Sequence, residues 1–196
     1  MTPAIVERAA RIRLLLMDVD GVLTNGTYFH VPGPQGEWVE TKAFNTQDGI
    51  ALKWLHEAGI AAGLISGRKS QAVELRAEQG KFKYVYQGNT EKIPMLEEIL
   101  ADSGLGREQV GYIGDDFTDV VIMHRVGFAV AVGNARPEVK SKAHFVTSAA
   151  GGDGAVREAI ELILKAQGLW DGVLKHYEIG EGKAVEAVHV SDETQW

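Results

Sequence analysis

Two aspartates, Asp18 and Asp20, are the residues of this 196-residue chain whose type and spacing point most directly to chemistry. They follow the run 12–17, which is apolar except for Arg13 and is typical of a buried strand. The fold itself has no need for two carboxylates at the end of such a strand. A phosphoryl group beside a magnesium ion does, because one carboxylate can attack phosphorus while the other transfers protons. A pair of surface acids is the alternative, and the apolar strand before the pair disfavours it.

Chemically capable side chains also follow three later apolar runs. Ser66 and Arg68 come after residues 60–65, Lys92 after 84–86, and Asp115, Asp116 and Asp119 after 110–113. In an open α/β sheet ligands bind beyond the carboxyl ends of the strands, so we expect these side chains to gather at one edge. A hydroxyl, an ammonium and carboxylates suit phosphoryl transfer, which depends on positioning and electrostatic stabilisation. Carboxylate oxygens favour Mg²⁺, which takes only one or two carboxylates.

The alternation of short apolar strands with helices predicts an α/β fold, a Rossmann-like parallel sheet with helices on both faces. We expect strands at 12–17, 60–65, 84–86, 110–113, 128–132 and 144–146, and helices at 3–11, 48–58, 70–79, 90–101, 117–125, 137–142 and 155–167. Two further β-type runs, 27–31 and 37–44, are joined by Pro-Gly-Pro-Gln-Gly and predict a small β-hairpin inserted after the first strand.

These elements predict a single domain over residues 1–170, with the hairpin insertion at about 26–44. Residues 171–196 are acidic and weakly patterned. We expect a helical turn or two there, followed by a mobile C-terminal extension.

Composition excludes several classes of function. The net charge of −7 and the pI near 5.4 argue against a nucleic-acid partner. The absence of cysteine excludes disulfides, thiolate zinc sites and a cysteine nucleophile. No run approaches the roughly 20 apolar residues of a membrane span, and the first residues lack the pattern of a signal peptide. We therefore expect a cytoplasmic protein with no membrane partner.

Four segments together resemble the motifs of the haloacid dehalogenase-like phosphatases. They are Asp18-Val19-Asp20-Gly21-Val22, Ser66, Lys92, and Gly114-Asp115-Asp116 with Asp119. The resemblance covers roughly residues 13–168. The hairpin in place of a cap domain resembles one branch in particular, the 3-deoxy-D-manno-octulosonate 8-phosphate (KDO 8-phosphate) phosphatases, as do the segments 44–49, 65–68, 86–88 and 151–158.

The resemblance implies distinct roles for the two opening aspartates. Asp18 would attack phosphorus and become an aspartyl phosphate. Asp20 would protonate the leaving sugar oxygen and then deprotonate the water that hydrolyses the intermediate. Mg²⁺ would be held by the carboxylate of Asp18, the backbone carbonyl of Asp20, and Asp115.

Four other residues would support the phosphoryl group. By resemblance, Ser66 and Lys92 bind phosphoryl oxygens, Asp119 orients Lys92 or a metal-bound water, and Asp116 assists. Taken alone, Ser66, Lys92, Asp115 and Asp116 have plainer interpretations. A serine before a helix is commonly an N-cap, a helix lysine is commonly solvated, and Asp115 and Asp116 could cap a positive helix terminus.

The same resemblance implies a homotetramer whose hairpins join in a central barrel, so that a neighbour's hairpin roofs each site. Four residues would then lie near the site entrance, some of them across a subunit boundary, and could otherwise be turn residues: Thr24, Asn25, Asp48 and Gly49. Arg68 and Arg76 are candidates for the substrate's carboxylate, because a guanidinium binds a carboxylate bidentately, although either could be a surface arginine.

The function implied is Mg²⁺-dependent hydrolysis of a phosphorylated sugar acid, with KDO 8-phosphate favoured, and a place in lipopolysaccharide biosynthesis. One alternative is a phosphatase for a nine-carbon sugar-acid 9-phosphate, a branch that carries an acid where Arg68 stands. Another is a non-catalytic oligomerisation module of the same fold. A response-regulator receiver domain is disfavoured by the two-residue spacing of Asp18 and Asp20. The chain departs from its branch at Asp153, where arginine is usual, and in its longer C-terminal extension.

Overall fold

The computed structural model describes residues 2–179, and in that part of the chain six parallel strands form one sheet in the order β5-β4-β1-β6-β7-β8. The strands are β1 (Leu14–Met17), β4 (Ala61–Ile65), β5 (Tyr84–Tyr86), β6 (Val110–Gly114), β7 (Phe128–Ala131) and β8 (Phe145–Val146). All four residues of β1 and of β7 are buried, as apolar strands covered on both faces must be. The predicted α/β fold with a parallel sheet is confirmed.

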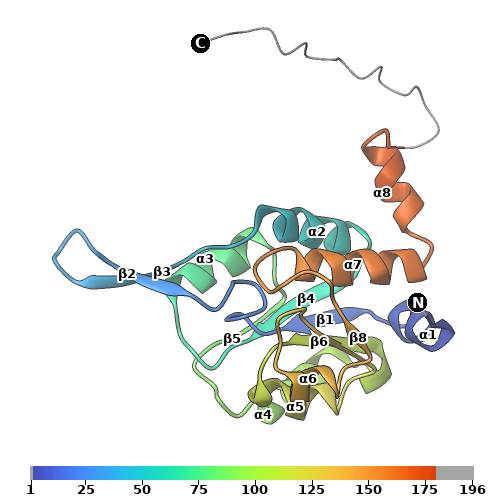
Figure 1. The fold of residues 1–196 in the computed structure, drawn as a ribbon, viewed down its shortest axis with the longest axis horizontal. Helices are drawn as coiled ribbons and strands as arrows, with labels where there is room; N and C mark the ends of the chain where they lie inside the picture. The colour runs from blue at the N-terminus through green and yellow to red at the C-terminus, as the bar shows by residue number, and fades with distance from the viewer. Residues whose placement is uncertain (1, 180–196) are drawn as a thin grey trace, which may run out of the picture.

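Helices cover both faces of this sheet, with α2, α3 and α7 on one side and α4, α5 and α6 on the other (Figure 1). Their bounds are α1 (Pro3–Ala10), α2 (Thr46–Glu57), α3 (Gln71–Gln79), α4 (Ile93–Ser103), α5 (Phe117–Met123), α6 (Pro137–Lys140), α7 (Ala155–Ala166) and α8 (Trp170–His176). A short 3₁₀ helix, Arg107–Gln109, was not predicted. The strands and helices therefore alternate along the chain as the sequence indicates.

Two helix starts differ from the prediction for local reasons. Helix α2 begins two residues early, because the side chain of Asn45 accepts hydrogen bonds from the backbone N–H groups of Gln47 and Asp48 and caps the helix. Helix α4 begins later than predicted, with Pro94 in its first turn, where the missing N–H of proline costs nothing.

The strand order places the site-bearing strand next to two strands that also end in polar residues. Strand β1 lies between β4 and β6, and Met17 pairs with Leu64 on one side and with Ile113 on the other. The carboxyl ends of these three strands are therefore level with one another. Residues that follow them are delivered to the same edge of the sheet.

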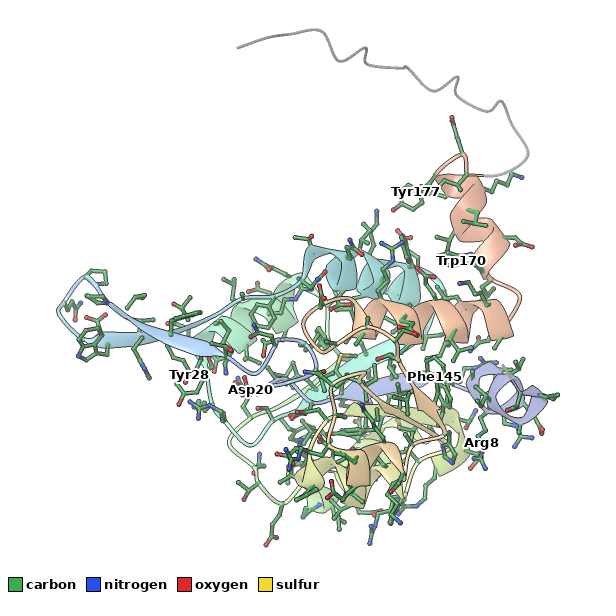
Figure 2. The ribbon with its side chains drawn as sticks, viewed as in Figure 1. Arg8, Asp20, Tyr28, Phe145, Trp170 and Tyr177 are labelled. Atoms are coloured by element: carbon green, nitrogen blue, oxygen red, sulfur yellow. The ribbon has the colours of Figure 1, made fainter. Side chains whose placement is uncertain are left out.

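The predicted hairpin is present as an antiparallel pair, β2 (Tyr28–Pro32) and β3 (Trp38–Lys42). It extends away from the body of the protein (Figure 1). Phe29, Val31 and Trp38 are exposed on it, Trp38 to 70%. At its base Tyr28 pairs with Lys42, and this end lies beside Asp20 (Figure 2).

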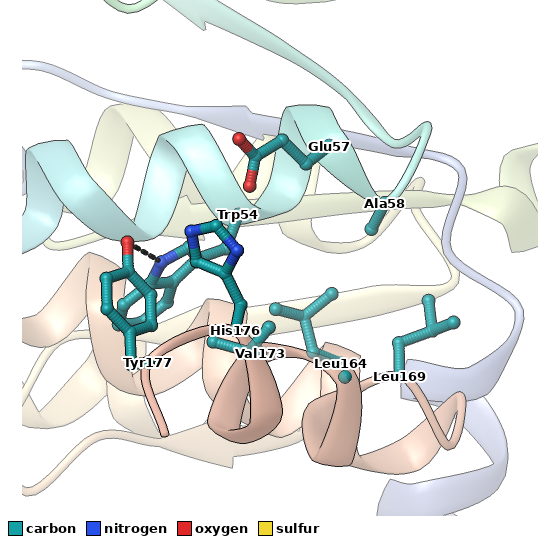
Figure 3. Close-up of a pocket in the computed structure, with 9 residues that line it drawn as sticks. Trp54, Glu57, Ala58, Leu164, Leu169, Val173, His176 and Tyr177 are labelled. Atoms are coloured by element: carbon teal, nitrogen blue, oxygen red, sulfur yellow. Dashed lines mark hydrogen bonds between the residues drawn. The ribbon is translucent and has the colours of Figure 1, made fainter. Parts of the chain in front are cut away.

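The predicted helical turns after residue 170 form helix α8, which packs on the domain through aromatic side chains. The indole N–H of Trp54 in α2 donates a hydrogen bond of 3.1 Å to the hydroxyl of Tyr177 (Figure 3). The ring centres of Trp54 and Trp170 lie 5.6 Å apart. A pocket of about 250 Å³ remains between α2, α7 and α8. The rest of the expected extension, residues 180–196, lies outside the described residues.

Among residues 2–179, none of the helices is both long enough and apolar enough to cross a membrane.

Candidate active site

Side chains from the ends of β1 and β4 and from the starts of α4 and α5 meet in one pocket of about 170 Å³. Asp18 and Asp20 follow β1, Ser66 and Arg68 follow β4, and Lys92 immediately precedes α4; Gly67, Thr90 and Thr118 complete the lining. Asp115 and Asp119 are not among the lining residues, but each has a carboxylate oxygen within 4.8 Å of one of the oxygens of Asp18. The sequence-predicted catalytic residues are thus brought together.

Asp18 lies where a nucleophile would be needed. Its side chain is mostly buried, and its Oδ1 is 3.0 Å from Nζ of Lys92. Burial and the charge of Asp119 raise the pKa of Asp18 to about 6, although Lys92 acts in the opposite direction. The carboxylate is therefore ionised at neutral pH but poorly solvated, which favours attack on an electrophile.

Lys92 is held in a buried network and is not a solvated helix lysine. Its side chain is 2% exposed, and its Nζ lies 2.7 Å from Oδ1 of Asp119 and 3.1 Å from the hydroxyl of Tyr112. The Tyr112 hydroxyl donates a 2.7 Å hydrogen bond to the same Asp119 oxygen. Burial lowers the pKa of Lys92, but the charges of Asp119 and Asp18 outweigh it and leave that pKa raised, so the ammonium is retained.

Asp119 also organises the loop that carries the fourth predicted motif, residues 114–119. Its Oδ2 accepts hydrogen bonds from the backbone N–H groups of Asp115, at 2.9 Å, and Asp116, at 3.1 Å. Asp116 is exposed and its side chain caps α5 by accepting from the N–H of Phe117 at 2.8 Å. The capping interpretation of Asp116 is therefore what the structure contains, and any further support from it stays a prediction.

The donor set beside Asp18 fits a hard divalent cation. Both oxygens of Asp119 are engaged, which leaves Asp18 and Asp115 as the available carboxylates. Oδ1 of Asp115 is buried and has no hydrogen-bond partner among residues 2–179. Burial and the charges of Asp119, Asp18 and Asp116 raise the pKa of Asp115 to about 8. A Cβ at Gly21 would come within 2.1 Å of this carboxylate, so only glycine leaves the space open. Mg²⁺ would relieve this repulsion.

Asp20 contacts two cations, one of which sequence reasoning missed. Nζ of Lys42 lies 2.5 Å from Oδ1 of Asp20, and Nε of Arg68 lies 3.8 Å from Oδ2. The side chain of Lys42 is fully buried. Lys42 ends β3, most of which is at least partly exposed, so the residue pattern of the strand does not indicate that its last side chain is buried. The contact with Asp20 depends on how the hairpin folds back onto the domain, which the local sequence does not show.

Arg68 lies at the pocket wall but is engaged by the hairpin. Its Nη2 is 2.5 Å from Oε2 of Glu40, and its guanidinium stacks 4.2 Å from the ring centre of Tyr28. Burial raises the pKa of Glu40, but hydrogen bonds from Arg68 and Lys42 outweigh it and leave that pKa below its ordinary value. Arg68 therefore already binds a carboxylate, that of Glu40, and a sugar acid would offer it the same kind of group.

Ser66 is buried and directly follows β4, in the loop that also carries Arg68. Its Oγ accepts a 3.2 Å hydrogen bond from the N–H of Arg68, and the N-cap position of α3 belongs to Ser70. The alternative interpretation of Ser66 as the cap of this helix is therefore wrong, and its hydroxyl proton remains available to a ligand.

Thr24 and Asn25 form the turn after the aspartates and do not line the pocket. Oγ1 of Thr24 donates to the carbonyl of Val19 at 3.3 Å, and the side chain of Asn25 accepts from the N–H of Thr27 at 2.9 Å. Their turn roles are present in the structure. Contact of either residue with substrate stays a prediction.

Asp48, Gly49 and Arg76 form a separate cluster between α2 and α3. Asp48 is buried and accepts a 2.8 Å hydrogen bond from the N–H of Arg157, and burial raises its pKa. Arg76 is half-buried over the ring of Phe44, and burial lowers its pKa. None of these three residues lines the pocket that contains Asp18 and Lys92, and their contact with substrate stays a prediction.

The glycine-rich turn before α7 packs directly on the loop that carries the aspartates. The N–H of Gly152 donates to the carbonyl of Val22 at 2.9 Å, and a Cβ at Gly151 would come 1.7 Å from the carbonyl oxygen of Gly21. Glycine is thus required at 151 for close approach and not for flexibility. Asp153, the departure from the family pattern, is exposed.

Comparison with known proteins agrees with this site. A family model described as haloacid dehalogenase-like hydrolase matches residues 71–160. The chain is 44% identical over 168 residues to the 3-deoxy-D-manno-octulosonate 8-phosphate phosphatase of Yersinia pestis, covering 86% of this chain and 88% of that protein. It is 40% identical over 167 residues to the phosphatase of the same name from Escherichia coli strain K12, covering 85% and 87%.

Solved structures agree as well. The crystal structure of the Yersinia pestis phosphatase matches with a TM-score of 0.82 at 43% identity, over 88% of this chain and 91% of that one. The phosphatase of Moraxella catarrhalis, crystallised with a magnesium ion, a phosphate ion and KDO, matches with a TM-score of 0.84 at 35% identity, over 90% and 99%. The chain therefore belongs to the haloacid dehalogenase-like hydrolases, in the family of the 3-deoxy-D-manno-octulosonate 8-phosphate phosphatases.

Proposed function

We propose that this protein is a Mg²⁺-dependent phosphatase that hydrolyses KDO 8-phosphate through an aspartyl phosphate. The observation that carries the proposal is the buried Asp18 carboxylate, which faces a pocket 3.0 Å from the fixed ammonium of Lys92. The family relationship supports the substrate, because the relatives at 40–44% identity are named for this reaction.

Each step of the reaction falls to a residue of the pocket. Asp18 attacks phosphorus, the bond between phosphorus and the sugar oxygen breaks, and Asp20 gives its proton to that oxygen. Asp20 then takes a proton from the water that hydrolyses the aspartyl phosphate and releases inorganic phosphate. The hydroxyl of Ser66 and the ammonium of Lys92 bind the phosphoryl oxygens throughout.

Mg²⁺ would be held by the carboxylates of Asp18 and Asp115, with the backbone carbonyl of Asp20 as a third ligand. When bound, it neutralises charge on the phosphoryl group and between the clustered carboxylates. The unpartnered Oδ1 of Asp115 supports this placement.

The substrate's carboxylate is assigned to Arg68, which reaches the pocket wall and already holds a carboxylate, that of Glu40. The nine-carbon branch that this chain also resembles carries an acid at this position, so the presence of Arg68 favours KDO 8-phosphate. A second candidate function, a non-catalytic module, is disfavoured because all four motifs are present and their side chains are in contact or share one pocket.

We further infer a homotetramer in the cytoplasm. The support is the hairpin, which has two strands with unpaired edges and exposes Phe29, Val31 and Trp38. Such a ribbon is stabilised by pairing or packing with other chains.

A substrate panel tests the assignment. We expect kcat/KM for KDO 8-phosphate to exceed the values for a nine-carbon sugar-acid 9-phosphate and for a hexose phosphate without a carboxylate. In Arg68→Ala the advantage of KDO 8-phosphate over the hexose phosphate should fall by roughly 10- to 100-fold, as expected for a lost charge-assisted pair. Faster cleavage of the nine-carbon substrate by the native protein would overturn the choice of substrate.

A further inference from the structure

Lys42 reaches the active site from the base of the hairpin. It is the last residue of β3, its side chain is 0% exposed, and its Nζ lies 2.5 Å from Oδ1 of Asp20 and 3.2 Å from Oε1 of Glu40. Lysine is almost never fully buried unless its charge is paired. Its burial is therefore explained by these two carboxylates.

The two oxygens of Asp20 have different surroundings. Oδ1 accepts the hydrogen bond from Lys42, whereas Oδ2 is buried without a hydrogen-bond partner. The nearby Nε of Arg68 is 3.8 Å from Oδ2, which is too far for a hydrogen bond. Asp20 is one of the residues that line the pocket, and among residues 2–179 nothing donates a hydrogen bond to its Oδ2, so Oδ2 is the oxygen still free to form one with a ligand.

The position of Lys42 is set by the hairpin and by α2 together. On one side it pairs with Tyr28 across the ribbon, with Nζ 5.6 Å from the centre of the tyrosine ring. On the other side the chain continues through two residues to Asn45, which caps α2. The backbone on both sides of Lys42 is therefore held in place, and this fixes the position of its ammonium group.

We propose that Lys42 is a positioning residue for proton transfer by Asp20. It binds Oδ1 and so directs Oδ2 toward the oxygen that leaves phosphorus. In that step the bond from Asp18 to phosphorus forms, the bond from phosphorus to the sugar oxygen breaks, and the proton on Oδ2 passes to that oxygen to give the sugar hydroxyl. This inference rests on the proposed role of Asp20 as the acid.

The need for a proton depends on the leaving group, and this dependence tests the proposal. A sugar alkoxide must be protonated as it leaves, whereas p-nitrophenolate leaves without a proton. The parameter kcat/KM covers only the steps up to departure of the leaving group, so later hydrolysis of the aspartyl phosphate does not enter it. In Lys42→Met, kcat/KM for KDO 8-phosphate should fall roughly 100-fold, with p-nitrophenyl phosphate changed by no more than about threefold.

Asp20→Asn serves as the reference and separates the two proposals. It should show the same selective loss, and Lys42→Met combined with Asp20→Asn should be no slower than Asp20→Asn alone, because the two residues act as one unit. Equal losses on both substrates in Asp20→Asn would refute its proposed role as the acid. A selective loss in Asp20→Asn with equal or no losses in Lys42→Met would overturn the role of Lys42.

Two further variants control for folding and charge. Lys53→Met removes an exposed lysine of α2, paired with Glu57 at 3.6 Å, and should leave both substrates unaffected. Should Lys42→Met fail to fold, Lys42→Gln carries the same test, since its amide can still donate to Asp20. It is expected to show a smaller loss with the same preference, and an equal loss on both substrates would contradict the proposal.

Discussion

The carboxylates of Asp18, Asp115 and Asp119 lie close together, and a bound cation would reduce the repulsion between them. Burial and mutual repulsion raise the pKa of Asp18 to about 6 and that of Asp115 to about 8, both above the ordinary value of 3.8. The folded protein without metal therefore binds protons more tightly than the unfolded chain. The contribution of these two carboxyl groups to the free energy of unfolding should therefore be most favourable at low pH. It should decrease as the pH rises through the pKa values of Asp18 and Asp115 in the folded protein.

Mg²⁺ binding should accordingly strengthen with pH. The ion must displace the protons on Asp115 and Asp18, so its affinity should rise between pH 6 and pH 8. Calorimetric titration of the native protein at the two pH values measures this. Asp115→Asn should bind weakly at both, and equal affinity of the native protein at pH 6 and pH 8 would contradict the assigned donors.

Tyr112 is a second residue whose loss should be felt. Tyr112→Phe removes a hydroxyl that donates to Asp119 and accepts from Lys92, both buried. We expect about 1–3 kcal/mol lower stability, and kcat about tenfold lower, because Lys92 loses part of its support.

The matched control is Tyr84→Phe. The hydroxyl of Tyr84 lies outside the site and donates a 2.7 Å hydrogen bond to Asp102, so its removal should leave kcat unchanged. Thermal melts and steady-state rates measure both variants. A native-like kcat in Tyr112→Phe would show that the network does not need the hydroxyl.

At the scale of secondary-structure elements, the packing of the glycine-rich turn on the loop that carries Asp18 and Asp20 predicts which glycine cannot be replaced. In Gly151→Ala the new Cβ would collide with the carbonyl of Gly21, so we expect a loss of about 1–3 kcal/mol and lower activity through a displaced aspartate loop. Gly172→Ala in α8 meets no atom within 4 Å and should be neutral or stabilising by up to about 1 kcal/mol. Equal melting temperatures for the two variants would contradict this account.

The sheet, the hairpin and the gathering of Asp18, Asp20, Ser66 and Lys92 in one pocket could be predicted from the sequence because each depends on local pattern. Apolar runs predict strands, and in a parallel sheet the residues after them share one edge. Lys42 and Tyr112 escaped because their roles depend on tertiary contacts, with Asp20 and with Asp119, that periodicity does not encode. Helix α2 starts two residues before the predicted position because Asn45, and not a residue nearer Asp48, caps it.

At the scale of the whole molecule, the proposed homotetramer is expected to depend on the hairpin. Trp38 is 70% exposed at the far part of the ribbon, well away from the pocket. We expect Trp38→Lys to weaken the proposed tetramer, and light scattering after size exclusion measures the change in mass. Val6→Lys on α1, at an apolar side chain 37% exposed, is the control that should leave the mass unchanged. A monomeric native protein at micromolar concentration would contradict the proposal.

The nucleophile is tested most directly by phosphate release from KDO 8-phosphate, with and without Mg²⁺, in the native protein and in Asp18→Asn. Asp153→Asn, at an exposed acid outside the pocket, is the control. We predict Mg²⁺-dependent release in the native protein and the control, and a loss of at least about 10⁴-fold in Asp18→Asn, since the covalent route is removed. Turnover by Asp18→Asn at the native rate would contradict attack by Asp18.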